Sequence, residues 1–123
     1  MAVRIRIKIR SRRSGSEREV SALVNSGFET ERPQILVPVA LARDLGLWPP
    51  PPDSYLVELA TAGGPVRNYL APDSLEIYAV TRDRVKGPVL CDAILSHLEE
   101  EVVINDKLGE ELGIVIIGLG SGK

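Results

Sequence analysis

Two segments of the chain, residues 35–47 and 102–114, carry the same residue pattern at a constant offset of 67 positions. Each segment begins with three apolar residues suited to a strand, passes into a helix start, and ends with a glycine and an apolar residue. The leucines that the copies share are Leu41 and Leu45 in the first and Leu108 and Leu112 in the second. Self-similarity at a fixed offset indicates duplicated architecture, so we expect a strand–helix unit to occur twice in one fold. Chance similarity between two short amphipathic segments is the alternative explanation.

The remaining pattern predicts a chain made mainly of strands. Residues 3–10 alternate apolar and basic side chains, which is the period of a strand with one buried face. Other strands are predicted at 19–24, 35–37, 55–62, 66–70, 75–81, 85–95 (interrupted at Gly87-Pro88), 102–104 and 114–119. Short helices are predicted at 39–45 and 106–112, the second with Asn105 as its N-cap. We therefore expect a mostly β fold, a small closed β-barrel with one or two short helices.

Composition bounds the class of protein. A length of 123 residues fits one domain over 1–123, with a flexible tail at about 118–123. A net charge of −2 provides no overall attraction to nucleic acid or to a membrane surface. The single cysteine, Cys91, excludes a disulfide within the chain and is expected to be a small buried residue. The first residues alternate Arg and Ile and form no apolar signal region, so we expect a cytoplasmic protein with no membrane partner and no cofactor.

The candidate functional site lies where an apolar run meets a short polar loop, at residues 22–27. Ala, Leu and Val favour a strand, and they are followed by Asn25, Ser26 and Gly27. Gly27 permits a tight backbone turn, and the hydroxyl of Ser26 can hydrogen-bond the loop backbone. Such a loop holds the side chain of Asn25 in a fixed place, which catalytic side chains require.

This stretch resembles the active-site loop of retropepsin-like aspartic proteases, in which an apolar strand ends in Asp-Thr/Ser-Gly. Asn25 stands at the position of the aspartate, whereas Ser26 and Gly27 fit the pattern. The likeness continues as an ordered series over residues 19–119, and among the branches of the family it is most similar to archaeal members. Residues 61–65 match the family's flap, and the resemblance assigns Ala62, Gly63 and Gly64 to substrate binding. Ile104-Asn105 matches the apolar-Gly position, and 114–119 matches the terminal strand. The family usually has glycine where this chain has Asn105.

The resemblance implies an acid-protease barrel of one lobe that works as a homodimer and holds an extended polypeptide under paired flaps. In the family, two aspartates meet on the twofold axis, share a proton and activate water. An amide at Asn25 cannot act as the base, so little or no peptidase activity is expected. Three explanations stay open: an engineered inactivation, a natural pseudoenzyme, or an ordinary turn asparagine outside this family. The alternative function is a non-catalytic β-barrel module for peptide binding or assembly.

Other chemistry-bearing residues have plainer explanations. A basic stripe on the first strand and its turn resembles a nucleic-acid surface but lacks stacking aromatics, so a solvated strand face is the simpler interpretation. The residues of this stripe are Arg4, Arg6, Lys8, Arg10, Arg12 and Arg13. His97 is the sole histidine; near 99–101 it makes a poor metal site, so none is predicted, and a pairing with Ser26 lacks an acid partner. Asp92 lies 67 residues after Asn25 and is either a vestigial counterpart, an acid near the cleft, or a surface or capping residue.

Overall fold

Strands dominate the computed structural model, which describes residues 3–25, 30–61 and 63–114. The strands are β1 (Val3–Ser11), β2 (Glu17–Val24), β3 (Gln34–Pro38), β4 (Tyr55–Thr61), β5 (Gly64–Val80), β6 (Val85–Ser96) and β7 (Val102–Ile104). The helices are α1 (Val39–Asp44) and α2 (Asp106–Glu111). Within the described ranges, no helix is long and apolar enough to cross a membrane.

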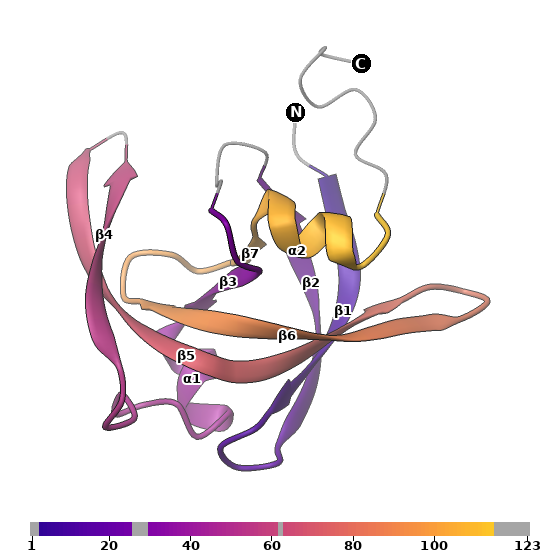
Figure 1. Cartoon of the computed structure of the whole chain (residues 1–123), viewed down its shortest axis with the longest axis horizontal. Coiled ribbons are helices and arrows are strands. Elements are labelled where there is room, and N and C mark those ends of the chain that lie inside the picture. Colours follow the sequence, from indigo (N-terminus) through magenta and orange to yellow (C-terminus); the bar gives the residue numbers. More distant parts are fainter. Residues whose placement is uncertain (1–2, 26–29, 62, 115–123) are drawn as a thin grey trace.

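The sheet closes on itself. Its strand order is β1-β2-β7-β3-β6-β5-β4, and β1 also pairs with β5, so six strands form a closed barrel. The seventh strand, β4, lies outside the closure and forms a long hairpin with the first half of β5 (Figure 1). The predicted fold class, a mostly β closed barrel with short helices, is therefore confirmed.

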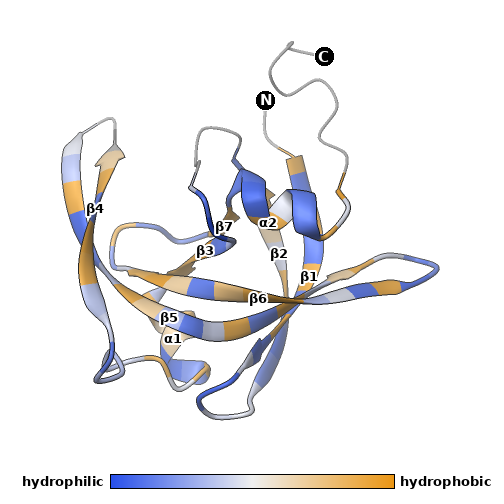
Figure 2. Cartoon of the chain, in the orientation of Figure 1, coloured by the Kyte–Doolittle hydropathy of each residue, from blue (hydrophilic) through white to orange (hydrophobic). Residues whose placement is uncertain are grey.

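Alternation along the strands fills the barrel. In β1, Ile7 and Ile9 are fully buried, whereas Arg6 and Arg10 face outward. The end of β2 and the second half of β5 alternate in the same way, whereas β3, β7 and the end of β6 bury consecutive residues. Figure 2 colours these strands by the hydropathy of each residue. Aliphatic side chains dominate the core because the chain has few aromatic residues.

The two copies of the sequence repeat lie side by side at the centre of the sheet. β3 pairs antiparallel with β7, and Leu36 lies opposite Val103, a residue 67 positions further along the chain. On either flank, β2 runs parallel to β7 and β3 runs parallel to β6. Each central strand leads into a six-residue helix. The arrangement has a local pseudo-twofold axis that passes between Leu36 and Val103.

The structure differs from the sequence prediction at two strands. Two strands were expected at 66–70 and 75–81, but β5 is one strand of 17 residues with a register shift between Ala71 and Leu75. β6 continues through Gly87-Pro88 and only shifts register there. Bulges bend a strand without ending it, which is why both breaks were mispredicted. Residues 115–123 lie outside the described part, as do most of the predicted strand 114–119 and the tail at 118–123.

Candidate functional site

Asn25 is the first residue after β2, at the end where β2 and β7 stop together. Val24 pairs with Ile104 in parallel register, and the backbone N–H of Asn25 donates to the carbonyl of Ile104 at 3.2 Å. Parallel strands that end side by side place the residues that follow them together, here Asn25 and Asn105. Asn25 is exposed in the single chain, whereas Asn105 is fully buried.

The other predicted site residues lie partly outside the described ranges. Ser26, Gly27 and Ala62 are in this group. Thr61 pairs with Gly64, whose φ is +108°, so the returning strand begins at Gly64, two residues before the predicted start at residue 66. Figure 1 shows the free end of the β4–β5 hairpin on the same side of the barrel as the end of β2 and α2.

Asn105 ties the segment before β3 to the second helix. Its side-chain oxygen accepts from the backbone N–H groups of Gln34 (3.1 Å) and Leu108 (2.9 Å), the latter capping α2. Its amide nitrogen donates to the hydroxyl of Thr30 (2.7 Å) and to the carbonyl of Arg32 (3.0 Å). All four hydrogen-bonding capacities of the amide are thus used inside the protein. The role of Asn105 as N-cap of α2 was predicted from the sequence, but its hydrogen bonds to the segment before β3 were not.

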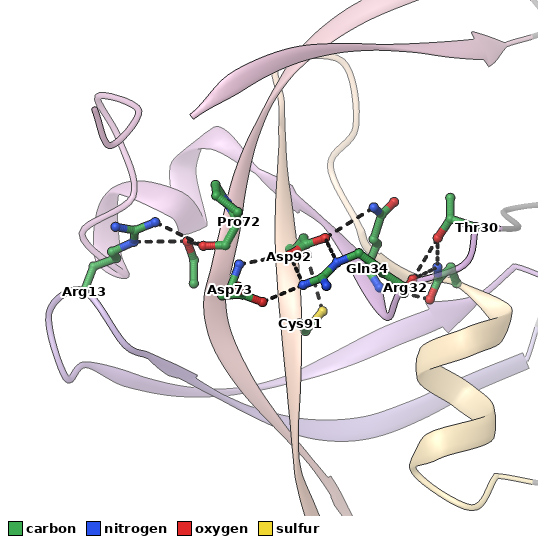
Figure 3. A network of polar contacts seen from close by, with 10 residues as sticks. Arg13, Thr30, Arg32, Gln34, Pro72, Asp73, Cys91 and Asp92 are labelled. Atoms are coloured by element: carbon green, nitrogen blue, oxygen red, sulfur yellow. Dashed lines mark hydrogen bonds and ion pairs between the residues drawn. The ribbon is translucent and has the colours of Figure 1, made fainter. Parts of the chain in front are cut away.

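An ion pair between exposed Arg32 and buried Asp92 fixes the same segment to β6. Arg32 donates through Nε (3.0 Å) and Nη2 (3.1 Å) to the two carboxylate oxygens of Asp92, and it also contacts Asp73 (Figure 3). The backbone N–H of Asp73 donates to the carboxylate of Asp92 at 2.9 Å. The side-chain amide nitrogen of Gln34 donates to the same carboxylate at 3.5 Å. Burial disfavours ionisation of Asp92, but the bonds from Arg32 and Asp73 outweigh it and hold the pKa of this carboxyl below its usual value.

The position of Asp92 corrects one sequence interpretation. A surface or capping aspartate was one expectation; the side chain of Asp92 is 2% exposed, so it is not a surface residue, although it does accept from the backbone N–H of Asp73. Its pairing with Gln34 across β3 and β6 also shows that Asp92 is not the counterpart of Asn25. The repeat matches Val102 to Ile35, and these residues pair with Ala22 of β2 and Ala93 of β6. Ala22 therefore corresponds to Ala93, and three residues further along Asn25 corresponds to Ser96. The loops in the two halves differ in length, and a constant offset therefore fails there.

A cavity opens between the hairpin and the turn that follows β6. Its volume is about 280 Å³. Its lining residues are Leu36, Leu59, Gly63, Val66, Asn68, Ser96, Leu98 and Glu99. Most of the lining is apolar, and Leu98 is 69% exposed at the edge. The dimensions suit a single side chain better than a drug-sized ligand, which occupies about 300–1,000 Å³.

The remaining candidate residues have structural partners. His97 is exposed and meets the ring of Trp48 edge-on, with 4.8 Å between centroids. Its pairing with Ser26 lies outside the described residues. Burial raises the pKa of the Cys91 thiol well above its usual range, so this cysteine stays protonated. No group of three metal-ligating side chains occurs in the described part of the chain.

Part of the basic stripe is balanced by acidic or aromatic neighbours. Arg4 pairs with Glu101 at 2.7 Å, and Arg6 with Glu19 at 2.9 Å. The ammonium of Lys8 lies 4.5 Å from the centre of the Tyr78 ring. These contacts favour the interpretation of a solvated strand face over a nucleic-acid surface.

Comparison with known proteins finds no matching family model and no matching curated protein.

Proposed function

We propose that the chain is a retropepsin-like aspartic endopeptidase scaffold, a homodimer in which Asn25 occupies the place of the catalytic aspartate. The observation that carries the proposal is the location of Asn25: exposed, at the joint end of β2 and β7, on the side of the barrel where the β4–β5 hairpin ends. The sequence resemblance assigns the catalytic side chain to this strand end, and the closed barrel is consistent with it.

The second subunit supplies what one chain lacks. A single chain of this length carries one copy of the Asn25 loop, and an aspartic peptidase needs two carboxylates that share a proton. In the proposed dimer the two loops meet on the twofold axis, where the paired amides hydrogen-bond each other without acting as a base. The dimer therefore keeps the cleft and loses the water-activating step.

The ligand of this cleft is an extended polypeptide. β4 pairs with β5 alone among the described strands, so its other edge offers backbone groups for strand addition. The cavity beneath the hairpin takes a side chain from such a strand.

Restoring the carboxylate tests the catalytic part. The Asn25→Asp variant is expected to cleave unfolded polypeptide at acidic to neutral pH, with inhibition by pepstatin, at least 100-fold faster than the unaltered chain. Asn25→Ala is the matched control and is expected to stay inactive. A folded, dimeric Asn25→Asp protein that cleaves no peptide pool would contradict the enzyme scaffold.

A non-catalytic binding module is the second candidate, favoured by the amide at Asn25 itself. The same cleft then binds peptide without cutting it. Binding of peptide by the unaltered chain, together with an inactive Asn25→Asp variant, distinguishes this candidate from the first.

A further inference from the structure

One polar residue interrupts the apolar inner face of the β4–β5 hairpin. Along β5, Val66, Asn68 and Leu70 point to the same face, while Arg67 and Tyr69 point outward and are exposed. Asn68 lies opposite Val57 of β4 and is only 8% exposed. An inward-facing asparagine in an apolar row is unusual, because buried amides cost free energy unless they are hydrogen-bonded.

The side chain of Asn68 has no hydrogen-bond partner among the described residues, and it lines the cavity of about 280 Å³. Ser96, which is 3% exposed, lines the same cavity. Its hydroxyl oxygen accepts from the backbone N–H groups of Leu98 and Glu99, both at 3.2 Å, so its proton remains to be donated. The cavity therefore combines apolar walls with an amide donor, an amide acceptor and a hydroxyl donor.

We propose that this cavity is a specificity pocket for a glutamine side chain of the bound polypeptide, with Asn68 as the residue that recognises it. The inference deepens the proposed function and rests on it, because the ligand strand that pairs with β4 must place one side chain in the cavity beneath the hairpin. Leu36, Leu59 and Val66 contact the aliphatic stem of the glutamine. Its terminal amide accepts from and donates to the amide of Asn68, a reciprocal pairing that leaves no buried polar group unmatched.

Charge and shape both select this ligand. A glutamate has the same length, but Glu99 at the edge of the cavity repels its carboxylate and no described lining residue is basic. A methionine fills the same space but leaves the Asn68 amide without a partner. Two neutral hydrogen bonds in a partly open site correspond to about tenfold in affinity.

The test uses the unaltered full chain labelled with ¹⁵N and pools of capped octapeptides with one central position held as Gln, Glu, Met or Leu. The Gln pool is expected to bind about tenfold more tightly than the Met pool and to shift the side-chain NH₂ signals of Asn68. Asn68→Leu is expected to remove the preference for Gln and to favour Met. Arg67→Leu, a neighbour on the outer face, is the matched control and keeps the preference for Gln.

The outcomes separate this inference from the function on which it rests. Pools that bind equally well, or a preference for Met with the Asn68 signals unmoved, would overturn the glutamine pocket and leave the peptide cleft standing. If no pool binds and Asn25→Asp cleaves nothing, the proposed function fails and the pocket fails with it. The NMR signals of the unaltered chain decide the matter even if Asn68→Leu does not fold.

Discussion

At the scale of single residues, two buried polar side chains hold the segment that follows the Asn25 loop. Asn105 bonds that segment and caps α2, and Asp92 binds it through Arg32. Nearly all the hydrogen bonds of the two side chains are made to residues 30–34 and to the elements packed around them. The geometry of the candidate site therefore depends on residues that do not belong to it.

Asn105→Ala removes four hydrogen bonds at a fully buried position. The free energy of unfolding is expected to fall by about 2–3 kcal/mol, because the cap of α2 is lost and buried partners are left unpaired. Urea denaturation of the two proteins under identical conditions measures the difference. A loss below about 0.5 kcal/mol would mean that the bonds of Asn105 are replaced by water.

Arg32→Ala leaves the buried carboxylate of Asp92 without its positive partner. Because the pKa of Asp92 is lowered in the folded protein, its ion pair stabilises the fold above the unfolded pKa of about 3.9 and is lost as the pH falls through the lower folded pKa. The variant is expected to be about 2 kcal/mol less stable at pH 7, since half-exposed Arg32 limits the effect, and the difference shrinks below pH 4.

Denaturation at pH 7 and at pH 3 tests this prediction, with Asp92→Asn as the matched variant. Asp92→Asn leaves a half-exposed arginine that keeps its ion pair with Asp73, so it is expected to cost less at pH 7 than Arg32→Ala. A difference that stays constant between the two pH values would exclude Asp92 as its source.

At the scale of elements, alternation and spacing predicted most strands, both helices and the repeated strand–helix unit. The errors fall at the two bulges, where the chain bends but keeps pairing. The side chains that line the candidate site or hold its neighbouring segment in place were predicted less well. Asn68 breaks a period-2 apolar row, a signal that the sequence does contain, whereas the Arg32–Asp92 pair joins residues 60 positions apart and depends on strand register. Register over that separation cannot be read from local pattern.

Gly87 shows how closely the bulge in β6 is packed. Its φ is +124°, and a Cβ atom there would lie 2.6 Å from the carbonyl oxygen of Ile77. Gly87→Ala is therefore expected to destabilise the fold by roughly 2–3 kcal/mol. Gly15, with φ +77° and open space around it, is the matched control, and Gly15→Ala is expected to cost about 1 kcal/mol. Equal losses in thermal or urea unfolding would contradict a close backbone approach at the bulge.

At the scale of the whole molecule, the central claim is that two copies of the chain bring their Asn25 residues together. The proposed dimer rests on the exposed position of Asn25, on the side of the barrel that it shares with the hairpin end, and on the sequence resemblance. Neither the glutamine pocket nor the predicted activity of Asn25→Asp is meaningful without this dimer.

Crosslinking at position 25 tests the dimer most directly. In a Cys91→Ala background, Asn25→Cys carries one thiol per chain, and a short thiol-specific crosslinker joins two such thiols only when they lie close together. Arg10→Cys, at the opposite end of the β1–β2 pair, is the control. We predict a covalent dimer for Asn25→Cys at low micromolar concentration and none for Arg10→Cys. Exclusively monomeric products from a folded Asn25→Cys protein would contradict the account.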